Sequence, residues 1–204
     1  MPQPTTMPDD RKQFEEFYAK GFKPWDSGVP EPELIRLLEA GKLPGKTVLE
    51  IGCGTGTNAI ELARRGYQVT AIDFVQQAIE TAKQKAVSAG VAIDFRLGDA
   101  TSMPLGGPYD VLFDRGVYHH LRMANLSAFQ GMLKRVTRPG TLWFSLAGNS
   151  KEKRVNEGPP TVSEDEIRAE LGPLFDILEL HEVRFGTNQE GFRPLAWAIL
   201  MKRK

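Results

Sequence analysis

Short apolar segments and longer amphipathic segments alternate along the middle of the chain. Continuous apolar stretches, bounded by glycine or polar residues, predict strands at residues 47–51, 68–72, 91–97, 109–113 and 141–146. Between them, apolar residues recur three and four positions apart and predict helices at 57–65, 75–86 and 129–136. Strands that alternate with helices in this way indicate a mainly parallel sheet with helices on both faces.

The pattern changes in the last quarter of the sequence. Ser163 and Glu166 form a capping-box sequence that predicts a short helix ending at Leu171. Two further strands are predicted at 175–185 and 195–201, and the loop between them is too short for a parallel crossover, so they should pair antiparallel. The predicted fold class is therefore α/β: a Rossmann-like, doubly wound, mainly parallel seven-stranded sheet with an antiparallel C-terminal hairpin.

The segment before the first strand follows neither pattern. Residues 1–10 are rich in proline and threonine, and we expect them to be disordered. The spacing of aromatic residues predicts a helix at 11–21, proline and glycine predict a loop at 24–30, and a leucine stripe predicts a short helix at 33–40. This part of the chain is therefore expected to be an appendage to the alternating fold.

Composition narrows the class of protein. The 204 residues carry 26 Lys+Arg and 26 Asp+Glu, and this zero net charge argues against a dedicated nucleic-acid binder, which usually has a basic excess. One cysteine forms no intrachain disulfide, and with three histidines and no CxxC motif we expect no metal site. No apolar run is long enough to cross a bilayer, and the first residues lack the features of a signal peptide, so we expect a cytoplasmic protein with no membrane partner.

A glycine-rich loop carries the strongest chemical signal. Gly52, Gly54 and Gly56 follow the first predicted strand and precede a helix, and Asp73 ends the next strand 21 residues after Gly52. Such a loop lies at the carboxyl edge of a parallel sheet, where ligands bind, and the carboxylate is placed to accept hydrogen bonds from a ribose diol. A dinucleotide fingerprint would need glycine at position 57, which is threonine, so another nucleoside cofactor is favoured.

With Glu50 two residues before the first glycine, the chain resembles the class I S-adenosylmethionine-dependent methyltransferases over residues 45–204. The resemblance implies S-adenosyl-L-methionine as cofactor and S-adenosyl-L-homocysteine as product. It places the ribose and adenine beside Asp73, Phe74 and the sequence Gly98-Asp99-Ala100, and the amino-acid part of the cofactor at the end of the fourth strand. The expected cofactor-binding residues are Trp25, Glu50, Gly52, Cys53, Gly54, Gly56, Asn58, Asp73, Phe74, Asp99, Ala100, Asp114 and Arg115.

A narrower resemblance lies in Pro24-Trp25-Asp26-x-Gly28-x-Pro30 and in the sequence Asp114-Arg-Gly-Val-Tyr-His119. Both are similar to small-molecule methyltransferases of the thiopurine, thiol/halide and tellurite-resistance type and to enzymes that methylate heterocyclic toxins. The likeness implies an N-terminal lid (residues 1–44) over a cofactor-binding domain (45–204). It implies acceptor contacts from Phe14, Tyr18, Tyr118 and His119, of which His119 and Tyr118 are the candidate catalytic residues.

Each of these residues also has a purely structural interpretation. The glycines could form only a strand–helix turn, and Cys53 is better read as a small loop residue than as a nucleophile. Trp25 could fill a gap, and Phe14 and Tyr18 could simply pack at helical spacing. His119 and His120 could be surface or capping residues instead of a base, and Arg115 could pair with Asp114 or with an acidic acceptor.

The predicted function is methyl transfer from S-adenosylmethionine to a sulfur, nitrogen or oxygen atom of a small-molecule acceptor, by a monomer or homodimer. The alternatives are a nucleic-acid or protein methyltransferase on the same fold, a non-catalytic cofactor-binding protein and an oxidoreductase. The sequence after the fourth strand, Asp114-Arg-Gly-Val, lacks the Asp/Asn-Pro-Pro-Tyr/Phe signature of amino-group DNA enzymes. We therefore expect no nucleic-acid partner.

Overall fold

The computed structural model describes residues 10–152 and 159–204. The disorder expected for residues 1–10 therefore lies outside the described residues, except at Asp10, which is helical and begins α1. The helices are α1 (Asp10–Ala19), α2 (Pro32–Glu39), α3 (Thr57–Arg64), α4 (Gln76–Ala89), α5 (Tyr118–Val136) and α6 (Glu164–Leu171). The strands are β1 (Thr47–Ile51), β2 (Gln68–Asp73), β3 (Asp94–Leu97), β4 (Val111–Arg115), β5 (Leu142–Gly148), β6 (Phe175–Arg184) and β7 (Leu195–Arg203). This order confirms the alternation predicted from the apolar pattern.

The seven strands form one sheet in the order β3-β2-β1-β4-β5-β7-β6. The first five strands pair in parallel, whereas β7 lies antiparallel between β5 and β6. The predicted fold class, including the antiparallel C-terminal hairpin, is therefore confirmed. Because β1 to β5 are parallel, their carboxyl ends all lie at one edge of the sheet.

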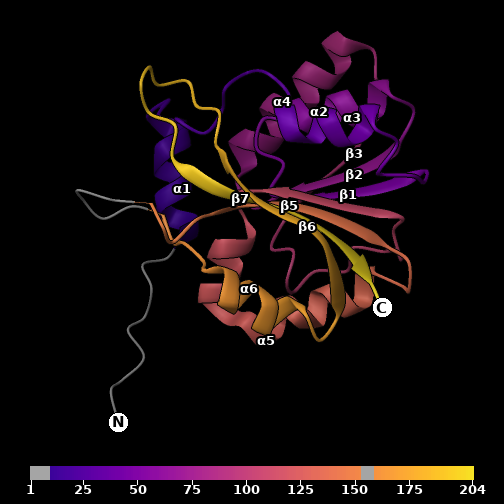
Figure 1. Ribbon diagram of the computed structural model, residues 1–204. Coiled ribbons are helices and arrows are strands. Elements are labelled where there is room, and N and C mark those ends of the chain that lie inside the picture. Colours follow the sequence, from indigo (N-terminus) through magenta and orange to yellow (C-terminus); the bar gives the residue numbers. More distant parts are fainter. Residues whose placement is uncertain (1–9, 153–158) are drawn as a thin grey trace.

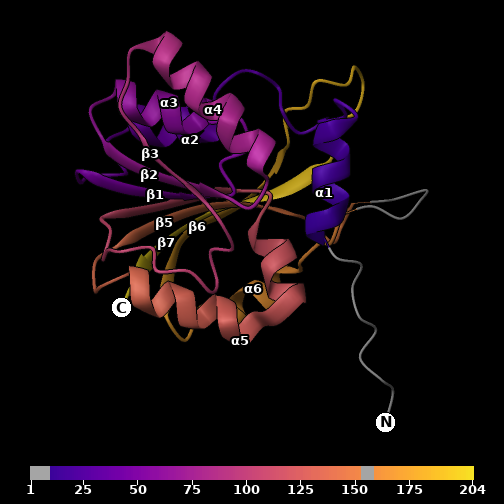
Figure 2. The same cartoon turned by 180° about the vertical axis from the view of Figure 1, so that it is seen from behind.

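Helices cover both faces of the sheet, and one helix stands apart from them. Figure 1 shows α2, α3 and α4 on one face and α5 and α6 on the other, and the reverse view in Figure 2 shows the same layers. In both views α1 stands beside one edge of the sheet, next to the long loop between β6 and β7. This is the edge at which the parallel strands end.

Two hydrophobic cores, one on each face, hold the layers together. In β5, Trp143 belongs to the core under α5 and α6, whereas its neighbour Phe144 belongs to the core under α2, α3 and α4. A parallel strand that is buried on both faces reads as a continuous apolar run, which is why this strand was predictable. Leu34 and Leu37 of α2 are fully buried in the second core. Helix α2 therefore packs with the domain, and we propose that the described part of the lid comprises residues 10–31 without α2.

Helix α5 differs most from its prediction. It begins at Tyr118 instead of Phe129 and contains a kink at Asn125, whose backbone is extended (φ −163°, ψ 92°). The side-chain Oδ1 atom of Asn125 accepts a hydrogen bond from the N–H of Ala128 at 2.9 Å, so this residue caps the second half of the helix. The first half is a separate short helix directly after the end of β4.

Strand β3 is shorter than predicted because the first residue of the predicted strand is hydrogen-bonded to the end of helix α4. The N–H of Val91 donates to the carbonyl of Ala86 at 3.1 Å, after Gly90 has adopted a left-handed conformation (φ +67°). This is the usual hydrogen-bonded end of a helix. Val91 therefore completes α4, and pairing with β2 begins only at Asp94.

Candidate functional site

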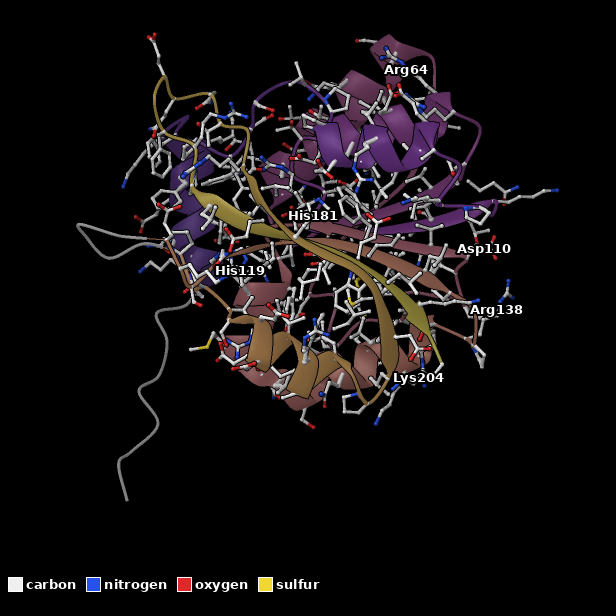
Figure 3. The ribbon with its side chains drawn as sticks, viewed as in Figure 1. Arg64, Asp110, His119, Arg138, His181 and Lys204 are labelled. Carbon is white, nitrogen blue, oxygen red and sulfur yellow. The ribbon has the colours of Figure 1, made fainter. Side chains whose placement is uncertain are left out.

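The predicted site residues gather at the carboxyl edge of the sheet. Glu50, Asp73 and Asp114 lie near the ends of the three adjacent strands β1, β2 and β4. Figure 3 shows His119 on the side of the molecule where α1 stands, while Asp110 and Arg138 lie on the opposite side. Sequence spacing therefore predicted that these residues share one edge of the sheet.

The glycine loop has a backbone that other residues would not tolerate. Gly52, Gly54 and Gly56 have φ angles of +66°, +54° and +78°, in the left-handed region that favours glycine. A Cβ atom at Gly52 would lie 2.3 Å from Cγ2 of Val117, and one at Gly56 would lie 2.9 Å from Cβ of Ala82. The loop is thus packed closely against α4 and the start of α5.

Glu50 is a buried carboxylate with one unpaired oxygen. The Asn58 side chain and the backbone of Ala59 lower its pKa and partly offset the effect of burial, but Oε2 has no hydrogen-bond partner among the residues that the structure describes. Burial raises the pKa of Glu50 to about 8, and the nearby charges of Asp73 and Asp114 act in the same direction. A buried oxygen of this kind is costly unless a donor or a cation satisfies it.

Asp73 connects the glycine loop to the second strand. Its Oδ2 atom accepts the N–H of Gly54 and its Oδ1 atom accepts the N–H of Val75, both at 2.9 Å. Burial nevertheless raises the pKa of this carboxyl group. An ionised carboxylate has about four acceptor positions, so Asp73 retains capacity for a ligand diol.

Asp99 and Cys53 border this region in different ways. Asp99, which is exposed after β3, accepts hydrogen bonds from the backbone N–H and the hydroxyl of Thr101, both at 2.7 Å, and it is followed by the buried Ala100. Cys53 is buried in the loop, and burial raises the pKa of its thiol well above the usual value. A neutral, buried thiol supports the interpretation of Cys53 as a small packing residue.

The N-terminal segment lies directly on the glycine loop. The hydroxyl of Thr55 donates to Oδ2 of Asp26 at 2.9 Å, and a Cβ atom at Gly54 would lie 3.2 Å from the Tyr18 hydroxyl. The ring of Phe14 lies 5.2 Å from that of Trp25 and 5.8 Å from that of Phe74. The structure therefore brings together the aromatic residues that the sequence assigned to the lid and to the adenine site.

The two adjacent histidines have different surroundings. His120 faces the lid, with its ring 5.5 Å from that of Phe14. His119 is only 3% exposed, and its Nδ1 atom accepts a hydrogen bond from the N–H of Gly148 at 2.9 Å. A neutral imidazole that accepts at Nδ1 carries its proton on Nε2, so it is arranged to donate from Nε2 and not to remove a proton there. This arrangement argues against His119 as a base and leaves His120 beside the lid.

Tyr118 and Asp114 point into the protein. The Tyr118 ring is buried 5.7 Å from that of Phe129, and its hydroxyl donates to Glu170 at 2.7 Å. Asp114 accepts hydrogen bonds from the N–H of Tyr118 and from the indole of Trp143, and burial raises its pKa to about 6. The structure thus argues against acceptor contact by Tyr118, because its helix turns that side chain under the sheet. The Asp114 carboxylate holds the start of α5.

Arg115 turns toward the lid, not toward an open surface. Its guanidinium group bonds to Glu31, to the carbonyl of Trp25 and to the carbonyl of Gly186. Glu31 had no motif to mark it, and Gly186 lies in a loop without any recognised pattern. Only their contacts across the fold reveal them, because residues 84 and 71 positions apart from Arg115 cannot be related to it by local spacing.

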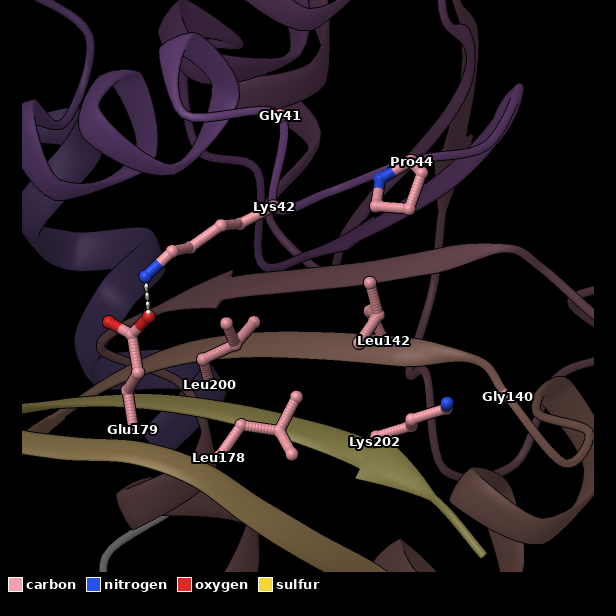
Figure 4. A pocket seen from close by; sticks show the side chains of 9 residues that line it. All are labelled: Gly41, Lys42, Pro44, Gly140, Leu142, Leu178, Glu179, Leu200 and Lys202. Atoms are coloured by element: carbon pink, nitrogen blue, oxygen red, sulfur yellow. Dashed lines mark hydrogen bonds and ion pairs between the residues drawn. The ribbon is translucent and has the colours of Figure 1, made fainter.

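A separate hollow of about 440 Å³ lies away from this site. Figure 4 shows that Leu142, Leu178 and Leu200 line its floor and that an ion pair between Lys42 and Glu179 crosses one end. The hollow lies where β1 and β5 begin, at the sheet edge remote from the glycine loop. It is therefore no part of the candidate site.

Two negative findings concern the described part of the chain. Within residues 10–152 and 159–204 no helix is long and apolar enough to cross a membrane. The same residues contain no group of three or more histidine, cysteine, aspartate or glutamate side chains placed to hold a metal ion.

Comparison with known sequences identifies relatives that share this motif region. The family model described as a methyltransferase domain matches residues 48–140. The chain is 28% identical over 173 residues to the 2-heptyl-1-hydroxyquinolin-4(1H)-one methyltransferase of Mycobacteroides abscessus, covering 83% of this chain and 76% of that protein. It is 27% identical over 167 residues to probable thiol methyltransferase 2 of Arabidopsis thaliana, covering 79% and 72% of the two chains.

Solved structures share the fold over nearly the whole chain. One, from work on the conversion of a disulfide bond into a thioacetal group during echinomycin biosynthesis, has a TM-score of 0.81 and 26% identity and covers 95% of this chain and 93% of its own. Another is the 1,6-didemethyltoxoflavin-N1-methyltransferase of Burkholderia thailandensis with its substrate and S-adenosylhomocysteine bound. It has a TM-score of 0.78, covers 100% and 94% of the two chains and, at 18% identity, shows likeness of fold alone.

Proposed function

Because the chain is a class I S-adenosylmethionine-dependent methyltransferase, we propose that it methylates a sulfur, nitrogen or oxygen atom of a small-molecule acceptor, as an enzyme of class 2.1.1. The observation that carries the proposal is the buried, unpaired oxygen of Glu50 beside the glycine loop. Two relatives, which match 83% and 79% of this chain, are named for a hydroxyquinolone and for thiols, which supports a small acceptor.

The residues present fit this cofactor. S-adenosylmethionine supplies a methyl group on a positively charged sulfur, together with an ammonium group and a ribose diol. Glu50 would hold the positively charged amino-acid end, because its unpaired oxygen needs a donor or a cation. Asp73 would accept the diol with its remaining acceptor positions, and Asp99 with Ala100 would border the adenine.

The chain itself contributes positioning and exclusion of water. Tyr18 lies against Gly54, and Phe14 and Trp25 pack beside Tyr18, so together they would form a largely apolar roof over the glycine loop. Holding two reacting groups in line under such a roof can lower the barrier by roughly 7–11 kcal/mol. A thiolate or an unprotonated ring nitrogen needs no base, so the arrangement of His119 as a donor does not oppose this reaction.

The acceptor is proposed to enter beside Phe14 and His120. These two residues lie where the lid meets the start of α5, close to the end of β4. The His120 ring presents a polar edge next to an aromatic face, which suits a small ligand with one polar group. We also propose that the enzyme acts in the cytoplasm, because its single cysteine is free and buried. A monomer or a homodimer is the proposed oligomeric state.

Calorimetry and an acceptor panel test the proposal directly. The full chain should bind S-adenosylhomocysteine and should not bind a nicotinamide dinucleotide. Small thiols, phenols and nitrogen heterocycles should then be screened with S-adenosylmethionine by following the release of S-adenosylhomocysteine. Failure to bind S-adenosylhomocysteine would overturn the cofactor assignment. Binding without turnover of any small acceptor, combined with methylation of an RNA or a protein, would overturn the acceptor class.

A further inference from the structure

Arg115 joins three segments that are far apart in the sequence. From the end of β4, its Nε atom donates to Oε2 of Glu31 at 2.6 Å, at the start of α2. Its Nη1 atom donates to the carbonyl of Trp25 at 3.1 Å, and its Nη2 atom donates to the carbonyl of Gly186 at 2.5 Å. The guanidinium also lies 5.0 Å from the centre of the Phe185 ring. The N–H groups of one guanidinium thus donate hydrogen bonds both to the lid and to the loop between β6 and β7.

The ion pair at the centre of this arrangement is buried. The side chains of Arg115 and Glu31 are 13% and 4% exposed. Removing one member of a buried pair leaves the other charge without compensation, which is far more costly than losing an exposed pair. The position of the two attached segments therefore depends on Arg115 more strongly than a surface contact would allow.

A second set of bonds joins the same two segments. The N–H of Asn188 donates to the carbonyl of Pro24 at 3.0 Å, and its side-chain Nδ2 atom donates to the carbonyl of Lys23 at 2.9 Å. Figures 1 and 2 both show the loop between β6 and β7 beside α1. This loop, residues 185–194, therefore extends the lid.

The same network reaches the cofactor loop. The N–H of Glu31 donates to Oδ1 of Asn58 at 2.8 Å, and Asn58 also influences the pKa of Glu50. Glu31, the partner of Arg115, and Glu50, the residue with the unpaired oxygen, therefore both interact with Asn58.

We propose that Arg115 is a positioning residue that fastens residues 185–194 to residues 23–31, so that both close together as one wall of the acceptor entrance. This assignment replaces direct cofactor contact as the role of Arg115, and its catalytic consequence rests on the proposed function. The loop 185–194, which contains no recognised motif, then contributes to the choice of acceptor.

Hydrogen–deuterium exchange on the full chain tests the fastening without any turnover. In the protein without ligand, Arg115→Ala should increase exchange in 185–194 and in 23–31 together, by about tenfold or more, while β1 and β2 stay protected. In the unaltered protein, S-adenosylhomocysteine should slow exchange in both segments. In Arg115→Lys it should slow exchange in 23–31 but not in 185–194, because one ammonium group cannot bind all three acceptors of the guanidinium.

Kinetics then separate positioning from cofactor contact. Arg115→Lys should raise the KM of the acceptor by about tenfold, with kcat and the Kd of S-adenosylhomocysteine each changed less than about threefold. Arg184→Ala is the matched control, since Arg184, the last residue of β6, donates to the carbonyl of Arg193 in the loop and pairs with Glu152 instead of with the lid. Asn188→Ala gives a second test if Arg115→Ala does not fold, and it should loosen the same two segments more weakly.

Three outcomes would overturn the proposal. They are unchanged exchange of 185–194 in Arg115→Ala and Asn188→Ala, an equal effect of Arg184→Ala, or a loss of cofactor affinity in Arg115→Lys as large as the change in acceptor KM. Absence of S-adenosylhomocysteine binding by the unaltered protein would instead contradict the proposed function. Hydrogen–deuterium exchange measured without ligand would still decide whether Arg115 fastens the loop.

Discussion

Glu50 links the chemistry of the site to its protonation. In the protein without ligand its carboxyl group is buried and has a pKa near 8, so it is largely protonated at neutral pH. A bound cation favours the ionised form. Cofactor binding near pH 7 should therefore release a proton from this residue.

Glu50→Gln is expected to weaken binding of S-adenosylhomocysteine by roughly 10- to 100-fold, since a hydrogen bond to a charged group contributes about 1.5–3 kcal/mol. Calorimetry at about pH 7 in buffers of different ionisation enthalpy should detect proton release in the unaltered protein and none in the variant. Glu39→Gln, at the exposed end of α2, is the control and should change neither quantity. Equal affinities for Glu50→Gln and the unaltered protein would exclude Glu50 from the cofactor site.

His119→Ala should leave the shape of the pH profile of kcat unchanged, because the bond from Gly148 occupies the nitrogen that would otherwise take up a proton. Stability should fall by about 1–3 kcal/mol, since the buried N–H of Gly148 loses its acceptor. Stopped assays across pH and urea unfolding measure the two effects. His181→Ala, in β6, is the control for loss of a more exposed histidine. Disappearance of the acidic limb of the profile in His119→Ala would restore a role as base.

Helix α5 is anchored to α6 by a cluster that the mechanism does not use. The Tyr118 hydroxyl and the Arg122 guanidinium both bond to Glu170 on α6, and these side chains are largely buried. The cluster fixes the first half of α5, which carries the two histidines. The cluster therefore fixes the segment beside which the acceptor is proposed to enter.

Tyr118→Phe should reduce the free energy of unfolding by about 1.5–3 kcal/mol, because a hydrogen bond to a charged carboxylate is lost. The value of kcat/KM should stay within about twofold, since the ring still packs against Phe129. Urea unfolding and steady-state assays measure these quantities. Tyr67→Phe, which removes a hydroxyl bonded to the carbonyl of Leu43, is the matched control and should cost less. A large loss of kcat in Tyr118→Phe would show that the hydroxyl reaches the acceptor.

Removal of α1 tests the lid as a unit. A chain that begins at residue 23 lacks Phe14 and Tyr18 and should lose about tenfold or more in kcat/KM, because water then reaches the glycine loop. A chain that begins at residue 10 is the control and should keep full activity. Cofactor affinity by calorimetry and turnover by release of S-adenosylhomocysteine give the comparison. Full activity without α1 would contradict the lid.

Elements with a complete local signal could be predicted from the sequence. The capping box of α6 forms as expected, with Ser163 and Glu166 bonded to each other's backbone, and β1 matches its predicted bounds. The start of α5 could not be predicted, because the kink at Asn125 interrupts any single apolar stripe between Tyr118 and Phe129. Without the start of α5, the direction of the Tyr118 side chain could not be predicted either. Tyr118 was therefore expected in the site, although it faces α6.

Some residues of the candidate site could likewise be predicted from the sequence, and others could not. Glu50, Asp73 and the glycines were predictable because strand order brings their positions to one edge of the sheet. The anchoring of the lid was not predictable, because Arg115 and Glu31 are 84 positions apart and neither belongs to a motif that specifies the other. Long-range pairs of this kind are fixed by packing and not by local pattern.

The pH dependence of stability belongs to the whole molecule. Glu50 and Asp114 have pKa values of about 8 and about 6 in the folded protein, above their ordinary values. At pH values between the ordinary and the raised pKa of each group, the folded state therefore binds more protons than the unfolded state. The free energy of unfolding should therefore fall as pH rises from about 5 to about 8. Carboxyl groups with lowered pKa, such as Asp110 and Glu179, act in the opposite direction but below this window.

Thermal unfolding without ligand should show a melting temperature that decreases across this range by a few degrees, since about 1 kcal/mol shifts the melting temperature of a protein of this size by roughly 2–4 °C. In Glu50→Gln the part of the decrease above about pH 6 should disappear, because the amide does not ionise. Saturating S-adenosylhomocysteine should reduce the same part by pairing the ionised carboxylate. A melting temperature that rises from pH 5 to 8 would show that neither carboxyl group is neutral in the folded protein.

The position of β7 has a consequence for how the site is assembled. β6 contacts the rest of the sheet only through β7, which itself must first pair with β5. The residues assigned to the cofactor site lie at or before Arg115 in the sequence, whereas the loop 185–194 that Arg115 holds lies between β6 and β7. During synthesis the cofactor-site residues therefore emerge first, and the loop proposed to border the acceptor emerges after them.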